Sequence, residues 1–320
     1  MMTNRFISVI AMWATLLFLP SCTNRDLCFD HNHIVDVELV FEWDNSQAPM
    51  PESMIIYFYN TNGQIGLYSI EESGSGKLRV PVGQYNIIAY NDDGSDLQAI
   101  NTDSFERHEL TTTECSILAP ILGVNATASV SAIIDETVTA SPKMIWCATE
   151  KNVIVHEKSD TIQRITLTPK QIASSITFEL QNVTGLEHVE AVSASLSGLP
   201  SSVILESGTL SSESVTMPFL MTKTDESTLR GTLYFFGHKK ECPSKHQLLL
   251  FLWMRSGNRF LMGSDSDRFN ISPLFHNEEQ TDSSYFVTIN GVNLPKPIGG
   301  GGGFDPSFDD WVEVNVTIDI

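Results

Sequence analysis

Apolar and polar residues alternate along much of this chain, and the alternation predicts β-strands. In residues 35–43 (VDVELVFEW) every second residue is apolar, and acidic residues occupy the other face. A period of two with β-branched and aromatic residues is typical of a half-buried strand. Residues 54–60 (MIIYFYN) are apolar on both faces. We therefore expect the first segment to cover a core and the second to lie in the interior of a sheet.

The same patterns recur between turn residues over the rest of the chain. They predict strands at 65–70, 77–82, 84–91, 116–122, 126–134, 152–156, 161–167, 175–180, 189–197, 203–205, 214–220, 231–236, 247–254, 259–263 and 284–290. Only one short helix is expected, near residues 169–174. Many short strands separated by Asn-, Ser- and Gly-rich turns predict an all-β fold built from β-sandwiches.

The N-terminal segment has the pattern of an export signal. Arg5 precedes an apolar run, Phe6–Leu19, which has the length of a signal-peptide core and is short for a membrane span. The sequence Leu-Pro-Ser-Cys at 19–22 resembles a bacterial lipobox, which predicts cleavage before Cys22 and lipidation of that residue. The alternative is an ordinary signal peptide cut elsewhere. No other apolar stretch has the roughly 18 residues that a membrane span needs.

A change in composition near residues 157–170 marks the expected boundary between two domains. The glycine run at 299–303 is expected to act as a flexible joint. The predicted division is a lipoprotein signal peptide at 1–21, a tether at 22–33, an N-terminal β-sandwich at 34–165, a C-terminal β-sandwich at 166–298, and a Gly-rich leash with a terminal strand at 299–320.

The last ten residues (WVEVNVTIDI) show the cleanest alternation in the chain. One face consists of aliphatic side chains, namely Val312, Val314, Val316, Ile318 and Ile320. Such a strand can complete its own sheet, or it can add to the edge of another subunit's sheet. We expect the aliphatic face to make the contact in either case.

Composition narrows the classes of partner. Of the 320 residues, 42% are hydrophobic, which is enough to bury a core. Asp and Glu number 39 against 19 Lys and Arg, so the formal net charge is −20. A field of this sign repels phosphate backbones, so nucleic-acid binding is not expected. It also disfavours docking to anionic lipid through a polybasic patch.

Motifs for catalysis are scarce. The sequence contains no G-x-S-x-G, H-E-x-x-H or C-x-x-C motif, and residues 73–77 (SGSGK) lack the spacing of a P-loop. We therefore expect a non-enzymatic protein without a cofactor. Cys28, His31 and His33 are the best candidate metal ligands, because a thiolate and two imidazoles suit zinc or copper. The alternative, a solvated tether without metal, is preferred.

Two further sets of residues leave their roles open. If Cys22 is lipidated, up to two disulfides can form among the other cysteines, Cys28, Cys115, Cys147 and Cys242, and their pairing cannot be read from the spacing. Five aromatic residues in predicted strands could stack on sugars if exposed, although strand aromatics more often fill a core. They are Trp43, Tyr57, Tyr59, Tyr85 and Tyr90.

Four stretches taken together resemble a known family. They are the lipobox at 19–22, the segment RVPVGQYNIIAYN at 79–91, residues 172–199, and the leash with its final strand at 299–320. In this order they resemble the fimbrillin superfamily of Bacteroidales-type surface lipoproteins, especially its fimbrium-anchor and fimbrillin-like branch. The resemblance implies two transthyretin-like β-sandwich domains, lipid-carried export to the outer membrane and cell surface, and assembly with fimbrial subunits by donor-strand exchange.

The sequence departs from the polymerising members of that superfamily. In those members, a trypsin-like protease cuts at a basic residue after the first strand and frees a groove. Here no Lys or Arg occurs between Arg25 and Lys77, so the loop at 44–53 offers no such site. The expected function is therefore an anchor or accessory subunit that keeps its lipid and contributes to adhesion. The alternative is an outer-membrane lipoprotein that binds surface glycans.

Overall fold

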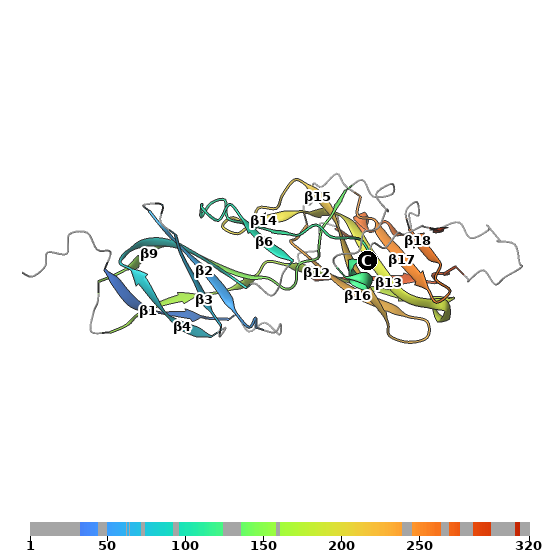
Figure 1. Ribbon diagram of the computed structural model, residues 1–320, viewed down its shortest axis with the longest axis horizontal. Coiled ribbons are helices and arrows are strands. Elements are labelled where there is room, and N and C mark those ends of the chain that lie inside the picture. Colours follow the sequence, from blue (N-terminus) through green and yellow to red (C-terminus); the bar gives the residue numbers. More distant parts are fainter. Residues whose placement is uncertain are drawn as a thin grey trace, which may run out of the picture.

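Strands dominate the computed structural model, which confirms the all-β class. The structure describes residues 33–43, 50–61, 63, 65–71, 74–91, 96–123, 136–157, 161–238, 245–263, 269–275 and 284–295, and the backbone of 311–313. The described strands form four sheets arranged along an elongated molecule (Figure 1). The predicted domain boundaries stay a prediction.

The first sheet has three strands and contains the first strand of the chain. Strand β1 (Ile34–Phe41) lies in the middle, antiparallel to β4 (Ser75–Pro81) and parallel to β10 (Gln163–Leu167). The predicted alternation is observed, because Val37 and Leu39 are fully buried while Asp36 is exposed and Glu38 is half-buried.

A second sheet of five strands packs against the first. Its order is β11 (Lys170–Gln171), β9 (Trp146–Val155), β5 (Gly83–Tyr90), β2 (Met54–Asn60) and β3 (Ile65–Ile70). The predicted interior position of β2 is confirmed, since it pairs with β5 on one side and β3 on the other. Apolar side chains from both sheets form one core, so these strands make an N-terminal β-sandwich.

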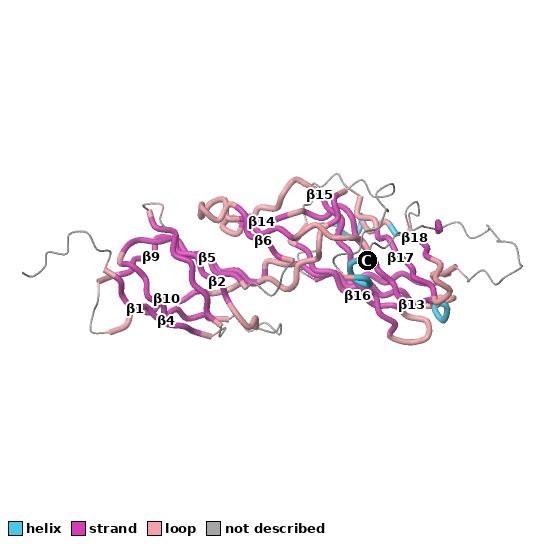
Figure 2. The backbone as a smooth tube through the Cα atoms, in the orientation of Figure 1, coloured by secondary structure: helices cyan, strands magenta, loops and turns pink. Residues whose placement is uncertain are grey.

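The C-terminal half is built on one nine-stranded sheet (Figure 2). Its order is β19 (Ser284–Asn290), β12 (Ser174–Gln181), β16 (Leu229–Phe235), β15 (Ser214–Lys223), β13 (Val189–Pro200), β17 (Leu248–Met254), β18 (Arg259–Met262) and β20 (Trp311–Glu313), and β8 (Thr137–Val138) pairs with β15. The sheet folds over its own core at β15, which pairs with β13 through most of its length and with β16 at its end. Phe178 and Phe219 stack across this core with ring centroids 5.4 Å apart.

A small third layer lies between the two halves. Strands β6 (Leu97–Ile100) and β7 (Glu109–Thr112) form a hairpin, and β14 (Ser202–Ile204) from the C-terminal half pairs with β7. Figure 1 shows β6 and β14 in this intermediate position. The hairpin covers the outer face of the five-stranded sheet, because Leu110 and Phe105 belong to the same core as Tyr90.

Two predicted elements are wrong within the described residues, and the strand predicted at 126–134 lies outside them. Residues 116–122 contain a short helix, α2 (Ala119–Leu122), in place of a strand. Pro120 stands in its first turn and the backbone N–H of Leu118 donates to Ser116 Oγ at 3.2 Å, both favourable at a helix start. Residues 169–174, the one predicted helix, are extended, because β11 pairs with β9 and β12 begins at Ser174. The remaining described helices are η1 (Leu186–His188) and α3 (Ser272–Phe275).

Candidate functional site

Strand β1 occupies a slot between two neighbours. It pairs with β4 from Ile34 to Val40 and with β10 from Val37 to Phe41. Its inward side chains, Val37, Leu39 and Phe41, are at most 4% exposed. Each buried aliphatic or aromatic side chain contributes about 1.5–3 kcal/mol to stability. The core of the N-terminal sandwich therefore depends on this strand.

Contacts at both ends of β1 extend its attachment. The N–H of Val82 donates to the His33 carbonyl at 2.7 Å, before the strand begins. The N–H of Glu42 donates to the Leu167 carbonyl at 2.9 Å, after the strand ends. On the outer face Arg164 of β10 forms an ion pair with Glu38 at 3.0 Å. The slot is thus filled along its whole length by the chain's own strand.

The predicted contact strand at the C-terminus is described only at its start. The backbone of Trp311–Glu313 pairs antiparallel with β18 at the edge of the nine-stranded sheet, with Val312 opposite Leu261. The other predicted contact residues, Val314, Val316, Ile318 and Ile320, lie outside the described residues. Their role stays a prediction.

The predicted lipid and metal positions fall mostly outside the description as well. Cys22, Cys28 and His31 lie outside it, and His33 is its first residue and is exposed. Within the described ranges no three His, Cys, Asp or Glu side chains are grouped so that they could hold a metal ion. In the same ranges no helix has the length and apolar character needed to cross a membrane.

Cys115 and Cys147 are free thiols in the described structure. Burial raises the pKa of Cys147 to about 12. Burial, together with the negative charge of Asp96, raises the pKa of Cys115 to about 11. Both thiols therefore stay protonated at neutral pH, and a protonated thiol is a poor nucleophile and metal ligand. Cys28 and Cys242 lie outside the described residues.

The aromatic residues considered as sugar platforms pack mainly into the fold. Tyr59, Tyr85 and Tyr90 are buried. Trp43 is partly buried and packs edge-on against Trp146 with ring centroids 5.4 Å apart. Tyr57 is partly buried. Because these faces pack against protein, stacking on an exposed aromatic platform is not what this arrangement offers.

Sequence reasoning gave no role to His108, which lies among three of these tyrosines. Its side chain is fully buried and its Nδ1 lies 2.6 Å from the hydroxyl of Tyr59. Rings of Tyr57 and Tyr90 approach it edge-on. Burial lowers the pKa of His108 to about 4, so the ring is neutral at pH 7. A neutral buried imidazole with a tyrosine partner fixes the β6–β7 hairpin on the sheet.

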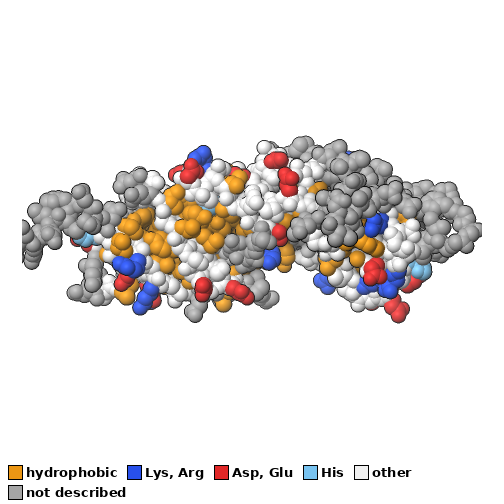
Figure 3. Space-filling view, in the orientation of Figure 1, with side chains coloured by type: hydrophobic (Ala, Val, Ile, Leu, Met, Phe, Trp, Pro, Cys, Tyr) orange, Lys and Arg blue, Asp and Glu red, His pale blue; other side chains and the backbone are white. Residues whose placement is uncertain are grey.

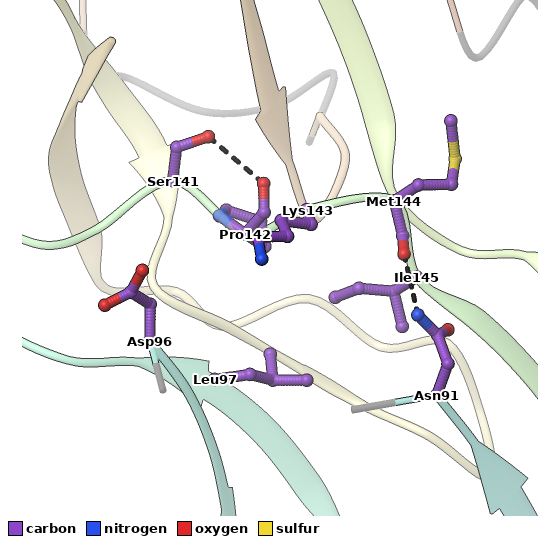
Figure 4. Close-up of a pocket in the computed structure, with 8 residues that line it drawn as sticks. All are labelled: Asn91, Asp96, Leu97, Ser141, Pro142, Lys143, Met144 and Ile145. Atoms are coloured by element: carbon purple, nitrogen blue, oxygen red, sulfur yellow. Dashed lines mark hydrogen bonds between the residues drawn. The ribbon is translucent and has the colours of Figure 1, made fainter. Parts of the chain in front are cut away.

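A second buried polar residue holds the junction between the two halves (Figure 4). Asn91, at the end of β5, donates from Nδ2 to the Met144 carbonyl at 2.9 Å and accepts from the Trp146 N–H at 2.6 Å. Upstream, Ser141 Oγ donates to the Tyr234 carbonyl of β16 at 2.9 Å. The cavity beside these residues has about 20 Å³, room for a single water. The hydrogen bonds serve to hold the structure together, and the cavity is too small for a ligand.

The outer surface of the N-terminal sandwich is unusually apolar at one edge. Strand β3 exposes Ile65 and Leu67, the latter by 62%. Figure 3 shows hydrophobic side chains gathered over the N-terminal half of the molecule. Exposed apolar side chains on a strand at the edge of a sheet suit contact with other protein surfaces.

The sequence matches a family model and a curated relative. A family model described as a domain of unknown function (DUF5119) matches residues 21–220. A Bacteroides ovatus protein, named as a candidate fimbrium anchoring subunit and called Fim4B, is 25% identical over 201 residues. That match covers 62% of this chain and 55% of the relative, so the chain spans little more than half the length of the curated relative it matches.

One solved structure shows a similar fold, and a second is reported beside it. The crystal structure of a candidate adhesin from Bacteroides ovatus has a TM-score of 0.58 and 20% identity, covering 87% of this chain and 98% of that one. The fimbrial anchor protein Mfa2 from Porphyromonas gingivalis has a TM-score of 0.47 and 14% identity, covering 90% of this chain and 98% of that one. The first of these two similarities supports the all-β architecture.

Proposed function

The chain belongs to the DUF5119 family, and from that premise we propose that it is a non-enzymatic, lipid-anchored subunit of a fimbria. In this proposal it serves as an anchor or accessory protein at the surface of the outer membrane and contributes to adhesion. The name of the Bacteroides ovatus relative, a candidate fimbrium anchoring subunit, supports this role. Cys22 would carry the lipid.

The observation that carries the proposal is the position of β1. A subunit that accepts a partner's strand needs an open slot, and here β1 fills the slot between β4 and β10. The absence of Lys and Arg between Arg25 and Lys77 removes the basic site at which a trypsin-like protease could cut after β1. A subunit that keeps its first strand also keeps the N-terminal tether, and with it the lipid on Cys22. This is the behaviour of an anchor.

Contact with the fibre would then use the C-terminal strand. Its alternate aliphatic residues, Val312, Val314, Val316, Ile318 and Ile320, can fill successive pockets of a groove while main-chain hydrogen bonds supply affinity. A groove on a neighbouring fimbrial subunit is the proposed recipient.

The anchoring role is tested by fractionation of intact native cells. Fibres are sheared from cells that carry the wild type, Cys22→Ala, or the matched control Cys28→Ala, and this chain is followed by mass spectrometry. We expect the wild type and the control to stay with the outer membrane. We expect the Cys22 variant to be released together with intact fibres. Unchanged fibres, with no fibre protein co-purifying, would refute the fimbrial role.

The strand contact is tested separately by charge placement. Val314→Asp and Val316→Asp put a carboxylate on the aliphatic face, and Asn315→Asp puts the same charge on the opposite face. Burial of an unpaired carboxylate is strongly unfavourable, so the two valine variants should weaken fibre attachment or folding while the control does not. Normal attachment and unchanged thermal stability in both valine variants would show that this face makes no contact.

A further inference from the structure

A polar cleft opens at one end of the N-terminal sandwich, and its described lining includes no residue of β1 or of 311–313. The ends of β2 and β5, the bend in β9 and the loop at 103–106 line it. Its volume is about 330 Å³, within the range of small-molecule sites. The cleft is therefore large enough for a ligand, in contrast to the cavity at the junction.

A β-bulge builds one wall of this cleft. The register between β5 and β9 shifts between Tyr85 and Ile87, and Asn152 of β9 adopts a φ of 58°. The backbone N–H of Asn152 donates to Asn86 Oδ1 at 3.0 Å. Gln84 Nε2 donates to Asn152 Oδ1, also at 3.0 Å. Bulges re-aim side chains and are frequent beside functional sites. Here the bulge fixes three amide side chains before any ligand arrives.

These amides keep part of their hydrogen-bonding capacity. Among the described residues, Nδ2 of Asn86, Nδ2 of Asn152 and Oε1 of Gln84 have no protein partner. Each NH₂ group can donate twice and each amide oxygen can accept twice. A wall that both donates and accepts matches a ligand whose groups do both, and hydroxyl groups are of that kind.

The charged groups of the cleft narrow the ligand further. Among the described residues that line the cleft, the carboxylates are Asp103 and Glu106 of the loop, and none is Lys or Arg. Arg107 Nη2 lies 3.5 Å from Asp103, and Ser104 Oγ donates to Glu106 at 3.2 Å. Lys151 Nζ lies 5.6 Å from the centroid of the Phe105 ring, outside the lining, so the charges that face a ligand directly are the two carboxylates, and these disfavour an anion. A metal ion would lack a set of three charged ligands, since none is grouped in the described part of the chain.

Buried aromatic rings close the inner side of the cleft. Tyr59 and Phe105 pack against each other with ring centroids 5.8 Å apart, and both are nearly inaccessible to solvent. Both residues line the cleft, so its inner side includes aromatic side chains beside the amide wall. An apolar surface next to fixed polar groups is the usual composition of a small-molecule site.

We propose that this cleft binds an uncharged saccharide, with ring hydroxyls hydrogen-bonded to Gln84, Asn86 and Asn152 and with C–H groups against the edges of Tyr59 and Phe105. The site is independent of the fimbrial role, because it uses neither Cys22 nor the C-terminal strand. It differs from stacking on an open aromatic face, since the amides carry recognition.

The decisive variant is Asn152→Gly. Glycine adopts a positive φ without strain, so the bulge and the backbone N–H remain while the side-chain amide is removed. Asn182→Gly is the matched control, because Asn182 is also an asparagine with positive φ (51°), at the end of β12 and remote from the cleft. A second variant, Gln84→Ala, removes the neighbouring amide from an exposed position.

The full chain, carrying Cys22→Ala to keep it free of lipid, is applied to an array of neutral and sialylated oligosaccharides, and hits are measured by calorimetry. We expect neutral oligosaccharides to bind, about tenfold weaker binding for Asn152→Gly and Gln84→Ala, and unchanged binding for Asn182→Gly. Absence of any neutral hit, preference for sialylated sugars, or full binding by Asn152→Gly would overturn the proposal. Because this assay needs no fibre, its failure leaves the fractionation result untouched.

Discussion

The first strands of the two halves occupy the same position in different sheets. Strand β1 has an antiparallel neighbour, β4, and a parallel one, β10, which lies near the end of its half. Strand β12 likewise has an antiparallel neighbour, β16, and a parallel one, β19. Both strands bury every second side chain, with Leu39 and Leu180 fully inaccessible to solvent. The same arrangement is therefore used twice.

The difference lies in what each strand connects. Among the described strands, β4 and β10 pair in this sheet with β1 alone, so loss of β1 would leave both without a strand partner. In the larger sheet, loss of β12 would leave β16 paired with β15, and only β19 at the edge would lose its partner. Loss of β1 would therefore take apart the described three-stranded sheet, whereas loss of β12 would detach one edge strand and leave the rest of the larger sheet paired. This explains why retaining β1 matters for the whole N-terminal sandwich.

The largest expected effect comes from truncating a matched leucine side chain in each of the two strands. Leu39→Ala and Leu180→Ala should each cost about 2–5 kcal/mol in unfolding free energy, because both remove fully buried atoms. Hydrogen exchange should show lost protection in β4 and β10 together for Leu39→Ala, but mainly in β19 for Leu180→Ala. Equal and global loss of protection in both variants would contradict the asymmetry.

A smaller effect is expected at the joint between the halves. Asn91→Ala removes the partner of the Trp146 N–H and of the Met144 carbonyl, and a buried unsatisfied group costs about 1–3 kcal/mol. Asn91→Asp keeps an accepting oxygen for the Trp146 N–H but places a buried carboxylate against the Met144 carbonyl, so it should be at least as destabilising as the alanine variant at pH 7. Chemical denaturation, followed by tryptophan fluorescence, measures the order of the three stabilities. An alanine variant as stable as the wild type would refute this role of Asn91.

Acid should weaken the N-terminal half through His108. Its folded pKa of about 4 lies below the ordinary value of 6.5, so protonation favours the unfolded chain. The neutral ring carries no penalty above pH 6.5, and stability falls as the pH drops from about 6.5 toward 4. Urea titrations between these pH values should give a shallower dependence for His108→Gln than for the wild type. The exposed His156→Gln is the control, and identical slopes for all three proteins would remove His108 as the cause.

The smallest effect concerns the ion pair between β1 and β10. Glu38→Gln should cost about 0–1 kcal/mol, since Arg164 is largely exposed and the pair is screened by salt. Glu42→Gln, a carboxylate that follows β1 and is also exposed, is the matched control and should cost less. Thermal melts at low and high salt separate the two. A loss above about 2 kcal/mol for Glu38→Gln would mean that the pair organises β1 more strongly than a surface contact can.

The alternation of apolar and polar residues was enough to predict most of the observed strands. The predicted strands at 54–60, 65–70 and 284–290 coincide with β2, β3 and β19. Strands β6 and β7 were missed, because residues 97–112 are rich in polar side chains and their burial depends on a distant sheet. The false helix at 169–174 is too short to be stable alone, and pairing with β9 decides its conformation. Local sequence cannot supply such long-range partners.

The candidate sites were harder to predict from the sequence than the fold was. The buried tyrosines and His108 come together only through the hairpin that covers the sheet, and His108 is 49 residues from Tyr59. The amide cleft depends on a bulge that places Asn152 beside Gln84, 68 residues away. In the sequence, polar residues at these positions look like the solvent-facing residues of ordinary strands. By contrast, the lack of basic residues after β1 was visible directly in the sequence.

The parallel pairing of β1 with β10 also determines how the protein would bear mechanical load. Tension applied upstream of Ile34 and resisted downstream of Leu167 acts on opposite ends of two parallel strands. Hydrogen bonds in a sheet run across the strands, so this force shears all of them at once instead of opening them one by one. The pairing with β4 would have to slide in the same event. A molecule pulled in this direction would yield abruptly and at high force.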